Sequence, residues 1–218
     1  MTIQSPQVDA DNYLEVDSED TAPKHGTTVQ AGWAAASAVL KPKKEAGNYP
    51  TDFRFSEQTQ VVRFLDDAPF AVYESHWIDR SEGKRSFVCL GKECPLCLIL
   101  GDKPRGKFAF NVLVLTDETP NLQILTAPPS LARMLETANE DPRRGPLTKY
   151  YWSISRQGSG PQTQYSLERI KPADLAEEWD LNPDDIEALA STATCYTDEV
   201  VYVTPQAELL TLARSLVN

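Results

Sequence analysis

The pattern of hydrophobic positions changes near residue 50. Before it, residues 1–30 have no hydrophobic periodicity, which is typical of disorder, and residues 31–40 predict a short apolar helix that Pro42 would end. After it, runs rich in β-branched and aromatic side chains are separated by turn signals, which is the pattern of short strands. These runs predict strands at 61–65, 70–78, 86–90, 107–116, 121–126, 149–156 and 163–170.

Helical patterns appear in the second half of the chain. Residues 130–138 predict a helix with Ser130 as its N-cap, and short acidic helices should begin at Pro172 and Pro183. The remaining C-terminal part predicts a late strand and then an amphipathic helix, at 195–203 and 205–217.

Many short strands with a few helices predict a mainly β domain, either a small β-barrel or a mixed α+β fold. We expect an acidic N-terminal segment with a short helix and a basic arm (1–49), a core (50–171), and an acidic helical C-terminal segment whose late strand joins the core (172–218). No apolar window reaches 18 residues, and the first 30 residues have neither a basic n-region nor an apolar h-region. We therefore expect a cytoplasmic protein with reduced cysteines and no membrane partner.

The strongest chemical signal is a cluster of metal-binding residue types. His76, Cys89, Cys94 and Cys97 fall within 22 residues, although the whole chain has two histidines and four cysteines. Zinc prefers four nitrogen or sulfur donors in a tetrahedron, and a Cys-x2-Cys turn delivers two thiolates to one ion. The pattern predicts one structural Zn²⁺ ion, because four protein ligands leave no open position for a substrate. Metal binding would order two loops, so it should be coupled to folding.

Other interpretations of these residues stay open. The cysteines can be ordinary buried thiols, or a redox pair, although the βαβ pattern expected around a redox Cys-x-x-Cys is not visible. The sequence contains no Walker loop, dinucleotide fingerprint, nucleophile elbow or His-Glu-x-x-His motif, so it does not predict an enzyme. The acidic pairs Asp66-Asp67 and Asp184-Asp185 are expected to face water.

The formal charge of −11 is unevenly distributed along the chain. Residues 1–20 carry −6 and residues 172–218 carry −9, whereas residues 21–171 carry +4. The central part also holds 15 of the 19 aromatic residues. A basic and aromatic centre between acidic flanks is compatible with nucleic acid, which the average charge alone would exclude.

A protein that binds single strands without sequence preference needs cations for the phosphates and aromatic faces for the bases. The centre supplies both in three short stretches, which contain Arg80, Lys84, Arg85, Lys103, Arg105, Lys107, Phe108, Phe110, Arg143, Arg144, Lys149, Tyr150, Tyr151 and Trp152. Each aromatic residue has an alternative place in the core. Phe108 and Phe110 share one face of their strand as barrel core residues do, and Tyr151 should face away from Tyr150 and Trp152.

The order of one histidine and three cysteines, with twelve residues between His76 and Cys89, resembles the T-even phage family of single-stranded DNA-binding (helix-destabilising) proteins. The resemblance covers about residues 50–170 as a pattern, and the gap from Cys89 to Cys94 is shorter than in that family. It implies an OB-fold-like Greek-key barrel with peripheral helices and a zinc-binding subdomain at about 70–106. It also implies replication or recombination proteins as partners of the acidic flanks, cooperative assembly on DNA, and the host cell cytoplasm if the chain is phage-encoded.

The sequence therefore predicts a phage-type protein that coats single-stranded DNA in replication, recombination or repair. A second hypothesis is a zinc-stabilised protein-interaction module, or a transcription or replication regulator, that acts on host proteins. A third hypothesis, a regulator that binds double-stranded DNA, lacks a clear recognition helix. In the first hypothesis the acidic flanks compete with DNA for the basic centre, so their removal should raise DNA affinity.

Overall fold

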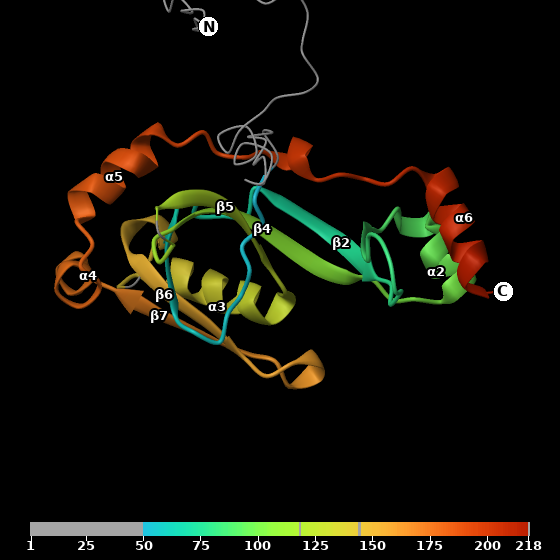
Figure 1. The fold of residues 1–218 in the computed structure, drawn as a ribbon, viewed down its shortest axis with the longest axis horizontal. Coiled ribbons are helices and arrows are strands. Elements are labelled where there is room, and N and C mark those ends of the chain that lie inside the picture. Colours follow the sequence, from blue (N-terminus) through green and yellow to red (C-terminus); the bar gives the residue numbers. More distant parts are fainter. Residues whose placement is uncertain (1–49, 118, 144, 218) are drawn as a thin grey trace, which may run out of the picture. The chain divides into compact units, whose positions relative to one another are not determined.

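The computed structural model describes residues 50–117, 119–143 and 145–217. The predicted acidic N-terminal segment, its apolar helix and its basic arm lie outside these residues, as does Arg144. The described part is a mixed α+β domain built on an antiparallel sheet (Figure 1). This confirms the α+β class.

Within the described residues seven strands form the sheet, and all of their mutual pairings are antiparallel. The strands are β1 (Gln60–Phe64), β2 (Ala71–Trp77), β3 (Ser86–Val88), β4 (Arg105–Val114), β5 (Asn121–Ala127), β6 (Tyr151–Gln157) and β7 (Gln164–Ile170). Their order is β3-β2-β4-β1-β6-β7, with β5 paired to β4. The predicted strands from 61 to 170 are confirmed, and the hairpin of β4 and β5 forms as expected.

The ten-residue strand β4 joins the two halves of the sheet. Its first half pairs with β2, where Ser75 lies opposite Arg105, and its second half pairs with β1, where Phe64 lies opposite Val112. Its last six residues are all buried, which explains why this strand is a nearly continuous apolar run. Within the described residues no further pairing closes the sheet, which is open, and the Greek-key barrel stays a prediction.

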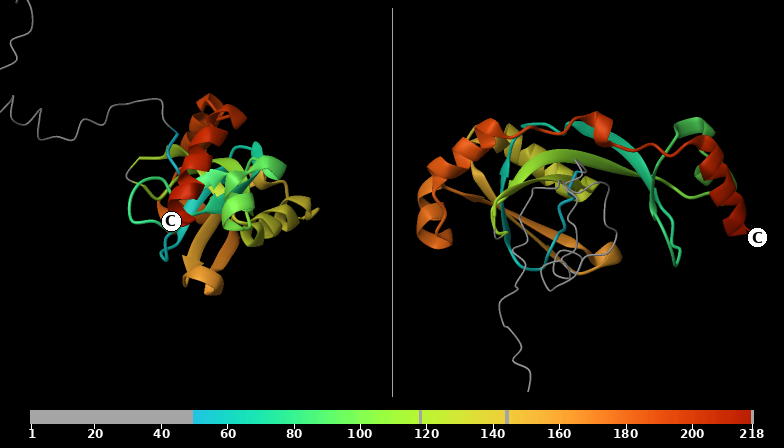
Figure 2. Two further views of the ribbon diagram at one scale, coloured as in Figure 1. Left: turned by 90° about the vertical axis from the view of Figure 1, so that its right-hand side faces the viewer. Right: turned by 45° about the horizontal axis from the view of Figure 1, so that its top comes forward.

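Helices cover both faces of the sheet (Figures 1 and 2). Helix α3 packs on one face, and α4 and α5 pack on the other. Helices α2 and α6 pack against each other beyond the end of β2. The helices are α2 (Pro95–Leu100), α3 (Pro129–Glu140), α4 (Pro172–Trp179), α5 (Pro183–Thr192) and α6 (Gln206–Val217), with short 3-10 turns η1 (Gly91–Glu93), η2 (Leu147–Lys149), η3 (Gly160–Gln162) and η4 (Asp198–Val200).

The helix predictions are confirmed for α3 to α6, with one error of capping. The predicted Asn182 cap of α5 is confirmed, because its side chain accepts a hydrogen bond from Asp184 N. The predicted Ser130 cap of α3 is wrong. Pro128 occupies the N-cap position and Ser130 lies inside the first turn, since Pro129 is well suited to begin a helix.

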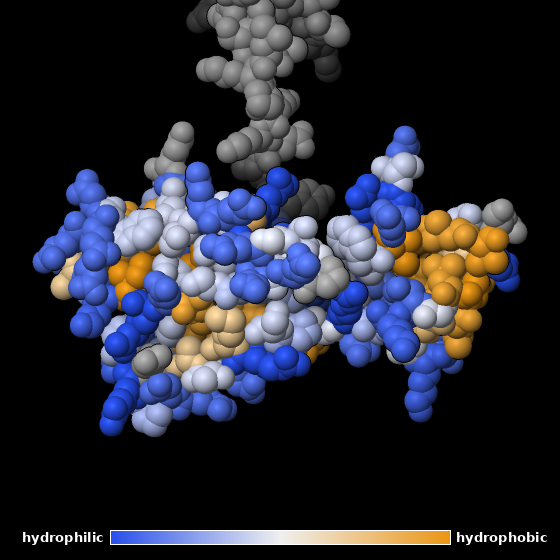
Figure 3. All heavy atoms as spheres, turned by 90° about the horizontal axis from the view of Figure 1, so that it is seen from below, coloured by the Kyte–Doolittle hydropathy of each residue, from blue (hydrophilic) through white to orange (hydrophobic). Residues whose placement is uncertain are grey.

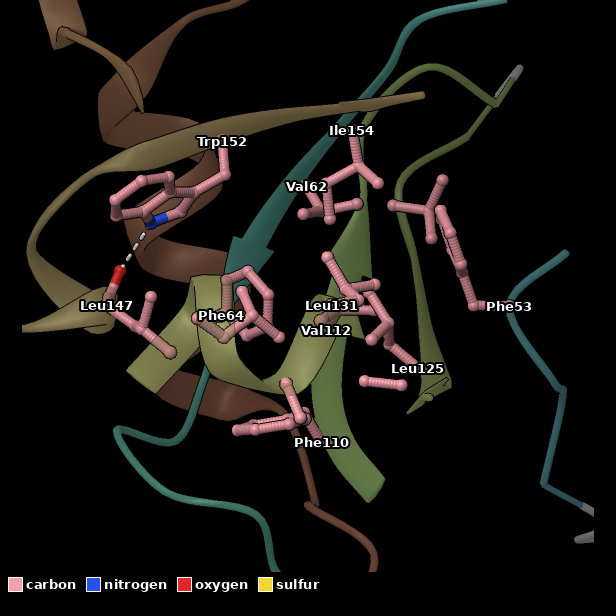
Figure 4. Packing of buried hydrophobic residues seen from close by; sticks show 14 residues of the cluster. Phe53, Val62, Phe64, Phe110, Val112, Leu125, Leu131, Leu147, Trp152 and Ile154 are labelled. Carbon is pink, nitrogen blue, oxygen red and sulfur yellow. Dashed lines mark hydrogen bonds between the residues drawn. The ribbon is translucent and has the colours of Figure 1, made fainter. Parts of the chain in front are cut away.

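The largest core cluster lies between α3 and the sheet (Figure 4). Phe64 and Phe110 meet edge to face with their ring centroids 5.7 Å apart. Trp152 is 2% exposed, and its indole Nε1 donates a hydrogen bond of 2.9 Å to the Leu147 carbonyl. The sequence offered Phe110 and Trp152 as stacking surfaces for bases. The structure assigns both rings to the core, because strand alternation turns them toward α3.

A second cluster on the opposite face holds α4 and α5 to the sheet. Val61 and Leu113 pack there with Ile186 of α5. Tyr151 is also buried in this cluster, and its hydroxyl donates a 3.0 Å hydrogen bond to the Glu187 carboxylate. Tyr151, another of the five aromatic residues predicted as DNA contacts, is therefore also a core residue.

The segment between α5 and α6, residues 193–205, crosses this second face as an irregular strap (Figure 1). The predicted strand at 195–203 is wrong. Tyr196 N donates to the side-chain oxygen of buried Asn111 at 2.8 Å, and the Asn111 amide donates to the Tyr196 carbonyl at 3.1 Å. The strap backbone thus bonds to a side chain instead of a strand, while Val200 and Val201 pack on the sheet. This half-burial explains its strand-like composition.

We expect Glu187 to make the stability of the fold depend on pH in the acidic range. Hydrogen bonds from Arg63 Nε (2.8 Å) and Nη2 (3.0 Å) hold the pKa of Glu187 below its ordinary value of 4.5. A carboxylate with a lowered pKa stabilises the folded state at neutral pH, and this stabilisation is lost as the pH falls through the lowered pKa. Half of this side chain faces solvent, so the contribution should be at most about 1 kcal/mol.

Urea unfolding of the wild type and of Glu187→Gln between about pH 3 and pH 7 tests this expectation. The difference in the free energy of unfolding should be constant near neutral pH and shrink below about pH 4.5. A difference that does not change with pH would contradict this role of Glu187.

Candidate functional site

The four residues predicted as metal ligands converge into one cluster. Their ligand atoms all lie within 4.8 Å of one another. His76 Nε2 is 3.4 Å from Cys94 Sγ and 3.5 Å from Cys97 Sγ, and the Sγ atoms of Cys89 and Cys97 are 3.7 Å apart. These residues can hold a metal ion.

These three separations are close to the edge lengths of a zinc tetrahedron. With Zn–S bonds of about 2.3 Å and Zn–N bonds of about 2.0–2.1 Å, two sulfurs lie about 3.8 Å apart and a sulfur and a nitrogen about 3.6 Å apart. A disulfide would need sulfurs about 2.05 Å apart, and all four cysteines are free thiols. The cluster is therefore compatible with one structural zinc ion.

Three separate segments of the described chain supply the ligands. His76 lies on β2 opposite Phe87 of β3, and this pairing brings Cys89, two residues further on, to the same side of the strands. The Cys89 N–H donates to the Glu74 carbonyl at 2.8 Å, which extends the contact between the strands. Cys94 is the N-cap of α2 and Cys97 lies in its first turn, so the Cys-x2-Cys turn is the start of a helix.

Asp102 completes the cluster and was not found from the sequence. Its carboxylate lies 2.7 Å from His76 Nδ1, and His76 itself is 1% exposed. A carboxylate that accepts the Nδ1 hydrogen leaves the Nε2 lone pair free to bind a metal, and such partners orient metal-binding histidines in many proteins. Gly101 adopts the left-handed conformation (φ 65°) that ends α2 and turns the chain to Asp102. The available signal was an acidic residue five positions after the last cysteine.

The thiols differ in their tendency to ionise. Burial, together with the neighbouring sulfurs of Cys89 and Cys94, raises the pKa of Cys97 to about 12. Burial also opposes ionisation of Cys94, but backbone hydrogen bonds at the start of α2 outweigh it and lower the pKa of Cys94 to about 7. Three adjacent thiolates therefore need a compensating cation, which a bound metal ion supplies.

A small apolar core supports the cluster, and α6 covers it. Phe87 and Leu96 are buried there against Leu209 of α6. The outer sides of α2 and α6 form an apolar surface (Figure 3), on which Leu98 is 71% exposed and Val217 is 62% exposed. The C-terminal helix therefore stabilises the cluster region (residues 76–102) on one side and leaves apolar side chains open on the other.

The cluster region adjoins a sheet face that carries cations and aromatic rings. Tyr73 lies opposite Lys107 and Ser75 lies opposite Arg105, so these residues share one face, and Trp77 follows on the same face of β2. The Trp77 side chain is 65% exposed. We refer to the surface formed by Tyr73, Trp77, Lys84, Arg105 and Lys107 as the Trp77 face.

The strap borders the Trp77 face and contacts one of its cations. Lys84 Nζ lies 4.7 Å from the centroid of the exposed Tyr202 ring and donates a 3.2 Å hydrogen bond to Thr204 Oγ1. Burial lowers the pKa of Lys84, and burial with the charge of Arg105 lowers the pKa of Lys107. Lys107 is half-buried, whereas Lys84 is exposed.

The structure separates the predicted DNA-contacting cations into two groups. The first group lies at the metal-binding end of the sheet and comprises Arg80, Lys84, Arg85, Lys103, Arg105 and Lys107. The second group, Arg143 and Lys149 with Tyr150, precedes β6, and strands β4 and β1 lie between β6 and β2. The predicted positions therefore do not form one continuous surface on neighbouring strands.

Individual members of these groups also differ in their surroundings. The Arg80 guanidinium lies 5.5 Å from the Phe87 ring centroid, and the Tyr150 ring is flanked by Arg169 at 4.5 Å. Phe108 is half-buried on the face opposite to the Trp77 face.

Trp77 was not among the DNA contacts predicted from the sequence. The available signal was strand alternation, because a metal ligand at His76 forces Trp77 to the other side of β2.

No protein-family model, curated protein sequence or solved structure matches the chain. In the part of the chain that the structure describes, every helix is too short or too polar to cross a bilayer.

We expect Cys94→Ser to abolish stoichiometric metal binding, because three remaining donors cannot close the tetrahedron. Since a bound metal would also order two loops, residues 76–102 should lose protection from hydrogen exchange in this variant. Metal analysis after dialysis should give one zinc per wild-type chain.

Cys195→Ser is the matched control, because Cys195 is exposed and lies outside the cluster. This variant should keep the metal and the protection. A Cys94→Ser protein that retains one equivalent of zinc with unchanged exchange would contradict the ligand assignment.

Proposed function

We propose that the protein binds single-stranded DNA through the Trp77 face, and that a structural zinc ion bound by His76 and the three cysteines holds this face in place. The observation that carries the proposal is the exposed Trp77 indole on the same sheet face as Arg105 and Lys107. Stacking of a base on an aromatic ring contributes about 1–3 kcal/mol and tolerates any sequence, and cations bind the phosphates. The surface provides both requirements at once.

Zinc suits the proposed role because the donors are one imidazole and three thiols. This set, with four protein ligands and no open position, is typical of structural zinc. The ion would supply a fixed tetrahedral geometry and positive charge. The chain itself supplies the orientation, since Asp102 fixes the His76 ring and the start of α2 presents two sulfurs.

The finer fold and biological role belong to the same proposal. An OB-fold-like core is supported by β4, which pairs with two different strands along one edge and with β5 along the other. Partly open Greek-key barrels of this class bind oligonucleotides on their strand surface. We infer a phage-type protein that coats single strands in replication, recombination or repair, with partner proteins recruited through acidic flanks.

A second candidate function is a zinc-stabilised protein-interaction module. The observation that favours it is the exposed apolar surface of α2 and α6, where Leu98 and Val217 face solvent. Such a surface is typical of contacts between proteins. In this case the cations of the Trp77 face would interact only with water and would not bind nucleic acid.

We expect oligo-dT to quench the fluorescence of Trp77 at low salt and duplex DNA of the same length to leave it unchanged. Trp77→Ala should weaken binding of labelled oligo-dT about tenfold, because one stacked base is lost. The affinity should also fall steeply between about 50 and 200 mM salt, since bound phosphates release counterions.

Trp179→Phe is the control, because Trp179 packs with α4 and α5 away from this surface. It should bind as the wild type does. Failure of the wild type to bind oligo-dT at low salt, or equal affinity of Trp77→Ala, would reject the Trp77 face.

We expect the strap to lower DNA affinity, because it contacts Lys84 of the Trp77 face and carries two acidic residues, Asp198 and Glu199. Complete removal of residues 172–218 would also remove Leu175 and Leu209 and so expose the two cores that they help to bury. Removal of charges alone is therefore the cleaner test. The double variant Asp198→Asn/Glu199→Gln changes two exposed residues and should raise the affinity for oligo-dT several-fold.

Glu177→Gln/Glu178→Gln on α4 removes the same charge from another surface and should have a smaller effect. An equal gain in both double variants would show that net charge alone sets the affinity and would contradict a specific role of the strap.

A further inference from the structure

A cavity of about 460 Å³ lies on the sheet face opposite to the Trp77 face. It opens between α3 and the turn that joins β1 to β2. Phe110, Leu135 and Leu147 form a buried apolar floor. Val72 at the mouth is 62% exposed, which is unusual for a valine in a strand, and it alternates with Tyr73 of the Trp77 face. The cavity is large enough to hold bulky apolar side chains.

The rim of the cavity is acidic. Among the described residues that line the cavity, the carboxylates of Asp67, Glu136 and Glu140 face one guanidinium, that of Arg133, which gives a net charge of −2. Within the described ranges none of these three carboxylates takes part in an ion pair, although Asp67 accepts a 3.0 Å hydrogen bond from Thr148 N. Glu136 and Glu140 are one helical turn apart, where two like charges destabilise a helix slightly. An occupant with positive charge would relieve this repulsion.

We infer that this cavity docks a segment of a partner protein that combines a bulky apolar side chain with lysine or arginine. The apolar side chain would fill the cavity and the cations would pair with the rim. A buried apolar anchor surrounded by complementary charge is the usual arrangement of an energetically important contact between proteins. Nucleic acid is the wrong occupant, because the rim would repel its phosphates.

This inference does not depend on the proposed DNA binding. The cavity and the Trp77 face lie on opposite sides of β2, so each can be occupied without the other. A partner held at the cavity would leave the Trp77 face free. The two sites would then connect a basic partner to whatever the Trp77 face binds.

Three labelled 14-residue helical peptides test the inference by fluorescence anisotropy with the full chain. The first carries leucines on one face and lysines on the other, the second replaces the leucines by glutamine, and the third replaces the lysines by glutamate. We expect the first peptide to bind at least tenfold more tightly than either of the others. Glu136→Lys/Glu140→Lys, which alters two exposed residues, should weaken its binding at least tenfold.

Glu177→Lys/Glu178→Lys on α4 gives the same net charge and should leave binding of the first peptide unchanged. Equal weakening in both variants would reduce the effect to bulk charge and overturn the inference, as would equal binding of the three peptides. NMR provides the location: the first peptide should shift the amide signals of Val72 and Leu147. If oligo-dT shifts these signals instead, the cavity belongs to the nucleic-acid surface and the inference is wrong.

Discussion

The convergence of His76 with three cysteine thiols is the contact on which the arrangement of this end of the molecule depends. Its ligands come from β2, from the residue that follows β3 and from the start of α2, so all three elements are fixed relative to one another by one cluster. Three sulfurs this close cannot all ionise without a cation nearby. A bound metal ion would compensate the negative charge of the thiolates. Its bonds to the four ligands would also stabilise the small apolar core beneath α6.

Strand alternation transmits this constraint to the surface. Because His76 points to the cluster, Trp77 must point to the other side of β2, where Tyr73 and the cations of β4 also lie. The same alternation turns Val72 toward the acidic cavity beside α3. The sheet therefore has two chemically different sides near the His76 cluster, one cationic with aromatic rings and one apolar with an acidic rim. The two sides suit different proposed partners: single-stranded DNA on the Trp77 face and a basic protein segment at the cavity.

Local patterns in the sequence predicted much of this arrangement. The four ligands were identifiable because their spacing is short, and the strands were identifiable from runs of β-branched and aromatic residues. The core position of Trp152 was not identifiable, because it depends on which face α3 covers, a contact between segments distant in sequence. The strap was mistaken for a strand because Asn111, 85 residues away, supplies its backbone partners. Asp102 was missed because its role exists only through the His76 ring.

The central claim is that the metal cluster organises a surface that binds single strands. The most direct test measures oligo-dT affinity on one preparation before and after the metal is removed by a chelator, while NMR signals of Trp152 and Phe64 report on the main core. The account predicts that DNA affinity falls at least tenfold, that the core signals stay in place, and that added zinc restores binding. Unchanged DNA affinity in the metal-free protein would contradict the account.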